Sequence, residues 1–146
     1  MLVLPDFVIL SLMTIKDVST NTIKQLIVIF YVSALFVQVL VIMKAIPYDW
    51  VNGGMSKSYE VQAVQSCISL VVLAGLFVFV LKMLTRGASS RKLRILYVIT
   101  LFLLIGLTMQ LLGTTFERYY LSLLLLLGVV SHGLLIRHIR SAQNNR

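Results

Sequence analysis

Four apolar stretches decide the fold: QLIVIFYVSALFVQVLVIM (Gln25–Met43), VQAVQSCISLVVLAGLFVFVL (Val61–Leu81), ILYVITLFLLIGLTMQLLG (Ile95–Gly113) and YYLSLLLLLGVVSHGLLI (Tyr119–Ile136). None of them contains Asp, Glu, Lys or Arg. A bilayer core about 30 Å thick is crossed by roughly 20 apolar residues of helix. The segments between the stretches are short, so successive helices should be antiparallel neighbours. The sequence therefore predicts an all-α membrane protein that forms an up-down four-helix transmembrane bundle.

The overall composition agrees with lipid as the solvent. The chain of 146 residues is 59% hydrophobic and only 12% charged, whereas soluble domains carry about 25% charged residues. We expect a single membrane domain at 24–140 and a frayed tail at 141–146. The N-terminal segment 1–23 begins with a short apolar run that Pro5 and Asp6 interrupt. This run is either an interfacial or reentrant segment, or it precedes a natural start at Met13; we favour the start at Met13.

Basic residues alternate between the two sides of the predicted bundle. Three of them, Lys44, Lys57 and Arg118, flank the first and third connections. The other ten fall on the opposite side: Lys16, Lys24, Lys82, Arg86, Arg91, Lys92, Arg94, Arg137, Arg140 and Arg146. Basic residues close to span ends favour the cytoplasm. The pattern predicts a multi-pass protein of the cell's inner (plasma) membrane, with both termini cytoplasmic and the 45–60 loop outside.

The net charge of +8 has a membrane explanation. A basic cluster beside a bilayer attracts anionic lipid headgroups. The second connection provides such a cluster, made of Lys82, Arg86, Arg91, Lys92 and Arg94. No nucleic-acid-binding motif accompanies the charge. We therefore expect anionic lipid, and no nucleic acid, as its partner.

Several helix boundaries carry local signals. Thr22-x-x-Gln25 and Thr114-x-x-Glu117 both fit a capping box, in which two side chains satisfy backbone N–H groups at a helix start. Ser56 or Ser58 could cap the second helix, and Gly87 suits its end.

Three amide side chains lie at a similar depth in three different spans. Gln38, Gln65 and Gln110 lie about 6–9 Å from the outer ends of their spans, at about 1.5 Å per helical residue. An amide that faces lipid is unfavourable, so these side chains should face the bundle interior. They form either a hydrogen-bonded layer between helices or the floor of an outward-facing polar pocket. The candidate pocket also includes residues of the outer connections: Asp49, Trp50, Glu60, Glu117 and Arg118.

Few groups in the chain could carry chemistry. His132 is the one ionisable residue inside a span, and we interpret it as an interfacial histidine about one turn from the cytoplasmic boundary, with proton transfer or metal binding as the alternative. Asp49, Glu60 and Glu117 balance Lys44, Lys57 and Arg118, which predicts salt-bridged loop packing. No Cys-x-x-Cys pair or phosphate-binding loop is present. We therefore expect no catalytic, cofactor-binding or metal-binding residues.

Two segments resemble a known pattern. Ile46-Pro47-Tyr48-Asp49-Trp50-Val51-Asn52-Gly53-Gly54, followed by Tyr59-Glu60, and Thr114-Thr115-Phe116-Glu117-Arg118 resemble a family of small four-span bacterial membrane proteins of unknown function. The resemblance covers about Gln25 to Ile136. It implies a bacterial inner-membrane protein and adds no substrate, cofactor or catalytic residue.

Three hypotheses for the function follow. The leading one is a non-enzymatic accessory or regulatory subunit, acting with a membrane protein partner or as a homo-oligomer. The second is a small oligomeric transporter or a lipid-binding protein that uses the outward-facing polar pocket. The third is an enzyme acting on a lipid headgroup. A cavity that reaches Gln38 and Gln110 favours the second hypothesis. Convergence of two of the three carboxylates on one pocket favours the third.

Overall fold

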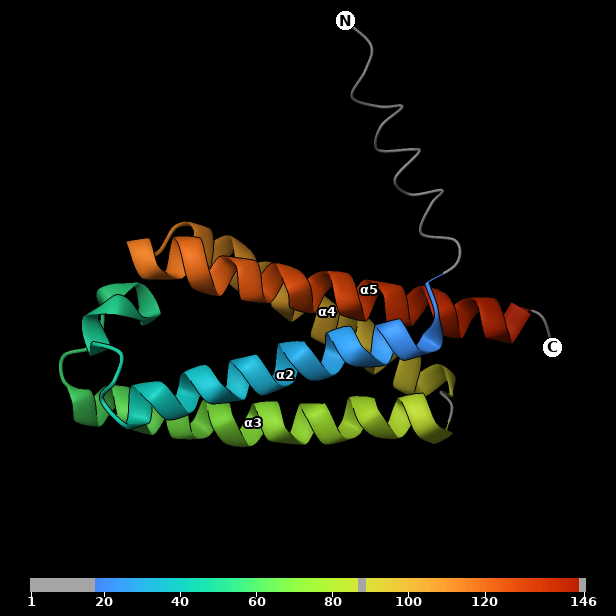
Figure 1. Ribbon diagram of the computed structural model, residues 1–146, viewed down its shortest axis with the longest axis horizontal. Coiled ribbons are helices and arrows are strands. Elements are labelled where there is room, and N and C mark those ends of the chain that lie inside the picture. Colours follow the sequence, from blue (N-terminus) through green and yellow to red (C-terminus); the bar gives the residue numbers. More distant parts are fainter. Residues whose placement is uncertain (1–17, 87–88, 145–146) are drawn as a thin grey trace, which may run out of the picture.

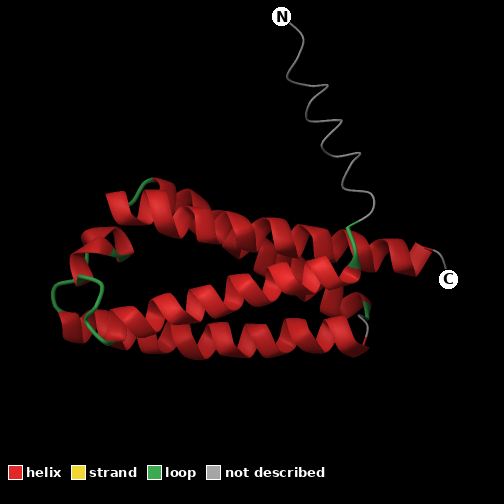
Figure 2. Ribbon diagram, viewed as in Figure 1, coloured by secondary structure: helices red, strands yellow, loops and turns green. Residues whose placement is uncertain are grey.

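The computed structural model describes residues 18–86 and 89–144. Its long helices are α2 (Thr20–Ile42), α3 (Tyr59–Arg86), α4 (Ser90–Leu111) and α5 (Ser122–Asn144). Two short 3₁₀ helices, η2 (Tyr48–Trp50) and η3 (Asn52–Gly54), lie in the first connection, and a π-helical turn, η4 (Glu117–Leu121), leads directly into α5. No strand occurs in this described part of the chain (Figure 2). The predictions for residues 1–12 and Gly87 lie outside the described residues.

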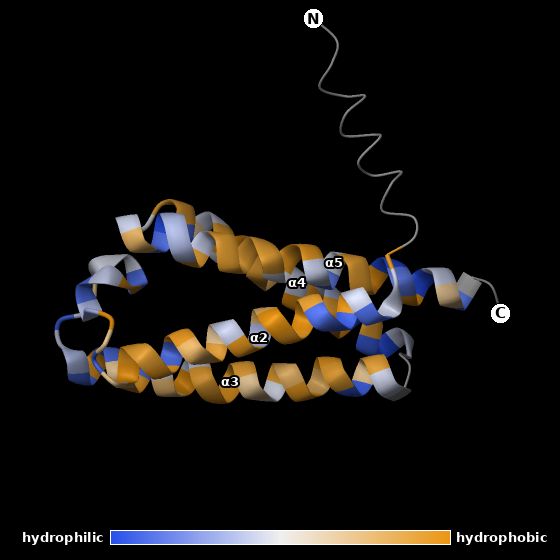
Figure 3. Cartoon of the chain, viewed as in Figure 1, coloured by the Kyte–Doolittle hydropathy of each residue, from blue (hydrophilic) through white to orange (hydrophobic). Residues whose placement is uncertain are grey.

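All four long helices are apolar and long enough to cross a membrane. Successive helices run antiparallel, so the 43–58 loop and the 112–116 turn lie together at one end, which we call the loop end (Figure 1). The other end, the termini end, holds the start of α2, the end of α5 and the α3–α4 connection. Apolar residues fill the middle of the helices and polar residues gather near both ends (Figure 3). The described part of the chain is thus all-helical, with four helices of spanning length as in a multi-pass membrane protein, and the predicted four-helix architecture is confirmed.

The bundle consists of two helical hairpins. The main helix contacts among the described residues are α2 with α3, α4 with α5, and α2 with α5 across the hairpins. No comparably extensive contact joins α3 to α4 within this part of the chain. The two hairpins are therefore docked mainly through α2 and α5.

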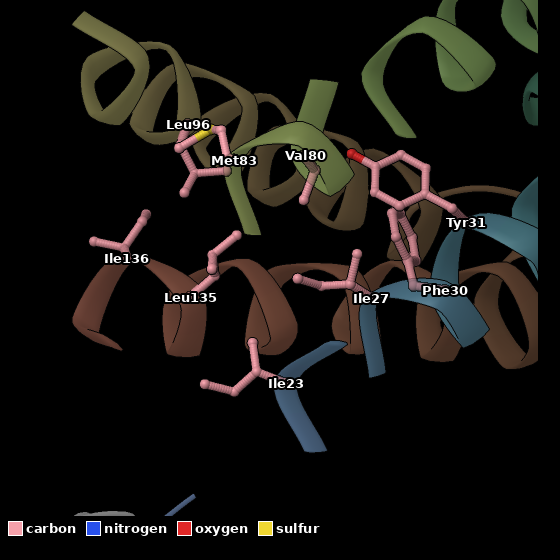
Figure 4. Packing of buried hydrophobic residues seen from close by; sticks show 9 residues of the cluster. All are labelled: Ile23, Ile27, Phe30, Tyr31, Val80, Met83, Leu96, Leu135 and Ile136. Atoms are coloured by element: carbon pink, nitrogen blue, oxygen red, sulfur yellow. The ribbon is translucent and has the colours of Figure 1, made fainter. Parts of the chain in front are cut away.

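An apolar core joins the hairpins from mid-bundle to the termini end (Figure 4). It comprises Ile23, Ile27, Phe30, Tyr31, Val80, Met83, Leu96, Leu135 and Ile136. A smaller cluster at the loop end contains Val41, Ile46 and Val51. Since the large core ends near Tyr31, the hairpins are held by fewer apolar contacts toward the loop end, where the candidate site lies.

The helix starts test the predicted capping signals. At the start of η4, Glu117 N–H donates to Thr114 Oγ1 at 3.3 Å, and Thr114 N–H donates to Glu117 Oε2 at 2.8 Å, so the predicted capping box is confirmed. The box predicted at Thr22 and Gln25 is wrong. Helix α2 begins earlier, and Ser19 caps it by accepting a hydrogen bond from Thr22 N–H at 3.1 Å. Ser58 accepts from Val61 N–H at 3.4 Å and so caps α3.

The contact between α2 and α5 is close because Gly128 has no side chain. A Cβ atom at Gly128 would lie 2.6 Å from the Phe30 ring. Next to it, the Tyr31 hydroxyl lies 3.1 Å from His132 Nε2, and His132 Nδ1 lies 2.8 Å from the Gly128 carbonyl oxygen. The carbonyl can only accept, so in the neutral imidazole Nδ1 donates to it and Nε2 accepts from Tyr31.

The interpretation of His132 as an interfacial histidine is wrong. Its side chain is fully buried and bonded to Tyr31, which lies at the middle of α2. The packing register of α5 against α2 brings His132 level with the middle of α2, so the residue lies deeper than the sequence indicated.

Candidate functional site

A cavity of about 770 Å³ lies at the loop end, between the two hairpins. Its walls come from α2, α3, α4, η4 and the first connection. The polar residues that line it are Gln38, Asn52, Ser56, Lys57, Gln62, Gln65, Ser69, Gln110 and Glu117. The apolar residues are Val37, Val41, Val51, Met55, Val61, Ile68, Met109 and Leu121. The cavity is therefore amphipathic, with amide, hydroxyl and charged groups beside aliphatic ones.

The cavity reaches the outer surface of the bundle between α3 and α4. Ile68 on α3 and Met109 on α4 both line it, yet they expose 61% and 62% of their surface. The close contact between α2 and α5, at Phe30, Gly128 and His132, lies on the termini side of the cavity, and none of these residues lines it. In the described part of the chain α3 and α4 lack a contact as extensive as those within the hairpins, so helix packing does not close this edge of the cavity.

Glu117 is the charged group with the most elaborate environment in this cavity. Its side chain is only 2% exposed. Gly53 N–H donates to both carboxylate oxygens at 3.0 Å, and Thr114 N–H donates to Oε2. The carboxylate thus connects the first connection to the start of η4. Gly113 leaves the room for it, since a Cβ there would lie 2.9 Å from the carboxyl carbon.

A network of amides forms the α3 wall of the cavity. Asn52 Nδ2 donates to Gln62 Oε1 at 2.9 Å and to Gln65 Oε1 at 2.7 Å. The Ser56 hydroxyl donates to Gln62 Oε1 at 2.5 Å, and Gln62 Nε2 donates to Ser66 at 3.3 Å. The carbonyl oxygens of Gln62 and Gln65 are thereby supplied with donors from the protein.

Gln110 differs from these amides. Its Oε1 is buried and has no hydrogen-bond partner, the one such side-chain atom in the described part of the chain. A buried acceptor without a donor is unfavourable by about 1–3 kcal/mol. In a polar cavity, a ligand or a water molecule can supply the missing donor.

The loop between α2 and α3 covers the cavity in an unusual backbone conformation. Asn52, Gly53 and Gly54 have φ angles of 54°, 66° and 71°, which are left-handed. Glycine adopts this region readily, and asparagine more readily than most residues. Thr114 Oγ1 donates to the Trp50 carbonyl oxygen at 2.5 Å. The loop is thus fastened to the 112–116 turn at Trp50 and to Glu117 at Gly53.

The structure brings together only some of the sequence-predicted site residues. Gln38, Gln65, Gln110 and Glu117 line the cavity, whereas Asp49, Trp50, Glu60 and Arg118 are not among its lining residues. Trp50 instead packs on Phe116 with ring centroids 5.7 Å apart. Glu60 accepts from the Ser58 hydroxyl at 3.3 Å, and Arg118 donates to the Gly113 carbonyl oxygen at 3.4 Å.

The predicted salt-bridged packing of the loops is wrong, because the carboxylates of Asp49, Glu60 and Glu117 have other partners or face solvent. Hydrogen bonds to backbone N–H groups satisfy Glu117, and Asp49 is exposed. Lys44 lies 5.4 Å from the centroid of the Tyr59 ring. Charge balance in the sequence therefore did not indicate pairing in space.

Sequence reasoning missed Asn52, Ser56 and Gln62. Gln62 and Gln65 are three residues apart and lie on one face of α3, a spacing that could have marked Gln62. The role of Asn52 depends on the left-handed turn and had no comparable signal. The π-helical turn η4 is a second missed feature; such turns are frequent at functional sites.

The arrangement offers hydrogen-bonding groups to a polar ligand. No group of three or more metal-ligating side chains occurs among the described residues. The chain matches no protein-family model, no curated protein and no solved structure. The resemblance of the 46–54 and 114–118 segments to a small four-span family stays a prediction.

Proposed function

We propose that this membrane protein binds a lipid and holds the lipid headgroup in the loop-end cavity. One observation supports the proposal: the cavity that reaches both Gln38 and Gln110 is also lined by Ile68 on α3 and Met109 on α4, two strongly exposed apolar side chains on helices of spanning length. A headgroup needs hydrogen-bonding partners, and its acyl chains need an apolar exit. The polar wall offers the headgroup hydrogen-bonding partners at Asn52, Gln62 and Gln65. The exposed edge at Ile68 and Met109 offers the acyl chains an apolar exit.

The position of the cavity supports binding over transport. The core around Ile27 and Val80 packs the bundle between mid-membrane and the termini end. The residues that line the cavity belong to the loop-end half of the helices, so the cavity is confined to that half of the bundle. A site confined to one half of the bundle suits a bound lipid better than a translocated solute.

The carboxylate positions support a non-enzymatic role. Acid–base chemistry on a headgroup would use two carboxylates at one pocket. Glu117 lines the cavity, whereas Asp49 and Glu60 do not. Lipid binding is compatible with the leading hypothesis of an accessory or regulatory subunit, since a bound lipid can stabilise a membrane protein or its contact with a partner.

The distribution of basic residues supports an orientation. Because the sequence pattern assigns ten basic residues to one side of the bundle and three to the other, we propose that both termini are cytoplasmic. The cavity would then lie in the leaflet away from the cytoplasm, in a bacterial inner membrane.

Native mass spectrometry of the detergent-purified protein tests the binding role. We expect wild-type protein to retain a lipid, and Gln110→Leu and Gln38→Leu to retain less of it. Gln25→Leu is the matched control, because Gln25 is exposed on α2 and does not line the cavity. If the amides only form hydrogen bonds between helices, the cavity variants should lose about 0.5–2 kcal/mol of stability and keep their lipid. That result would contradict the proposal.

A further inference from the structure

The chemistry of the cavity wall, taken with the proposed binding of a lipid headgroup, restricts the kind of headgroup. Glu117 contributes a carboxylate that is almost fully buried, and its partners are the backbone N–H groups of Gly53 and Thr114. No Lys, Arg or His pairs with it within the described residues. A buried charge without a counter-charge is costly, and an opposite charge brought close to it is correspondingly favourable.

The hydrogen-bonding capacity of the cavity wall also favours a positively charged headgroup with N–H donors. Two carboxylate oxygens offer about four lone-pair sites. Three hydrogen-bond contacts from two N–H groups reach them. Gln110 Oε1 has no donor at all. Gln110 and Glu117 thus line the cavity with acceptors that the protein itself does not saturate, and a ligand with donors and positive charge would complement them.

The cavity also contains a cation at its loop side. Lys57 lines it and is exposed to solvent. A lysine ammonium is a common partner of phosphate groups. A buried carboxylate on η4 and an exposed lysine on the loop together match a zwitterion that has a buried amine and a phosphate nearer the surface.

We propose that the cavity selects a primary ammonium group, which donates to the Glu117 carboxylate and to Gln110 Oε1. An aminophospholipid of the bilayer and a soluble amine share this chemistry. A quaternary ammonium headgroup has positive charge but no N–H donor, and a phosphoglycerol headgroup has donors but no positive charge. Both should bind less well.

The test is a binding titration by native mass spectrometry with purified full-length protein. Three phospholipids with the same acyl chains are compared: phosphatidylethanolamine, phosphatidylcholine and phosphatidylglycerol. Charge-assisted hydrogen bonds predict about tenfold tighter binding of the ethanolamine lipid than of either other lipid. Glu117→Gln should remove most of this preference, and Glu60→Gln, outside the cavity, should keep it. Equal binding of all three lipids by wild-type protein would overturn the proposal.

Two further variants distinguish failure of the headgroup preference from failure of the lipid site itself. Gln110→Leu weakens the same preference without touching the loop contacts of Glu117, so the test holds even if Glu117→Gln loosens the loop. Ser69→Phe narrows the cavity and should release every bound lipid, whereas Val72→Phe, exposed on α3 outside the cavity, should release none. If Ser69→Phe loses its lipid but wild-type protein shows no headgroup preference, the proposed selection of an ammonium group is wrong and the lipid site stands. Full lipid retention in Ser69→Phe overturns the lipid site itself.

The last arm adds water-soluble glycerophosphoethanolamine as a competitor. Failure to displace the lipid identifies the membrane as the source of the amine. If glycerophosphoethanolamine displaces the lipid at a concentration comparable to that of the lipid, the selection of an ammonium group is supported, and the proposal that a lipid supplies this group is wrong.

Discussion

Replacing Glu117 by alanine should detach the first connection from the rest of the bundle. The substitution removes the acceptor for Gly53 N–H and for Thr114 N–H, both of which donate to the carboxylate. Loss of the cap at the start of η4 is worth about 1 kcal/mol. Loss of a hydrogen bond to a charged acceptor is worth about 1.5–3 kcal/mol. Removing a buried charge relieves part of this loss, so we expect a net destabilisation of about 1–3 kcal/mol.

The chain contains a probe at the right place, because Trp50 is its single tryptophan. Its carbonyl oxygen accepts from Thr114, and its ring packs on Phe116. The unfolding of Glu117→Ala should be measured by titration with denaturant in mixed micelles. Circular dichroism reports on the helices and tryptophan emission reports on the loop. We expect the tryptophan signal to change at lower denaturant than the helix signal.

Two variants make this measurement decisive. Glu60→Ala removes an exposed carboxylate at the same end of the bundle and should cost less than about 0.5 kcal/mol. Gly113→Ala leaves Glu117 in the chain but places a Cβ atom against its carboxylate, so it should loosen the loop in the same direction as Glu117→Ala. Equal stability of Glu117→Ala and Glu60→Ala, with a single coincident transition for both signals, would refute the role given to the carboxylate.

Three further predictions concern the helix contacts and the orientation. Gly128→Ala should destabilise the bundle by about 1–3 kcal/mol in the same denaturation assay, because the new Cβ atom would overlap the buried Phe30 ring. Gly133→Ala on the same helix meets nothing within 4 Å and should be close to neutral. Tyr31→Phe should cost about 0.6–2 kcal/mol, the range for interhelical hydrogen bonds in membranes, and no loss would show that the buried imidazole gains nothing from the hydroxyl. In intact cells with a cysteine-free background, a cysteine at Met55 should react with an impermeant thiol reagent and a cysteine at Ser89 should not; the reverse pattern would invert the proposed orientation.

The sequence predicted the helices well because lipid imposes a strong constraint on length and polarity. It predicted their ends less well. Helix α2 begins at Thr20, and α5 continues to Asn144, because polar residues at the membrane surface extend a helix without any apolar signal. The depth of His132 was wrong for a different reason: it depends on the register of α5 against α2, which an apolar count along one helix does not specify.

The site was predictable in part. Gln38, Gln65 and Gln110 stood out because amides are unfavourable against lipid, and all three line one cavity. The buried environment of Glu117 was not predictable. It depends on a left-handed turn at Gly53 in a loop that is distant in sequence, and charge balance suggested salt bridges instead. Contacts that depend on the path of a long loop are not encoded in a local pattern.

The most direct test of the lipid site is intermolecular NMR in lipid nanodiscs. Nuclear Overhauser cross-peaks from the side-chain amide protons of Gln38 and Gln110 to lipid protons should be recorded with the Val72 methyl groups as the reference for ordinary lipid contact, since Val72 is exposed on α3. We predict cross-peaks from both amides to headgroup protons and cross-peaks from Val72 to acyl-chain protons alone. Cross-peaks from the two amides to water but to no headgroup proton would contradict the proposal that the cavity holds a lipid.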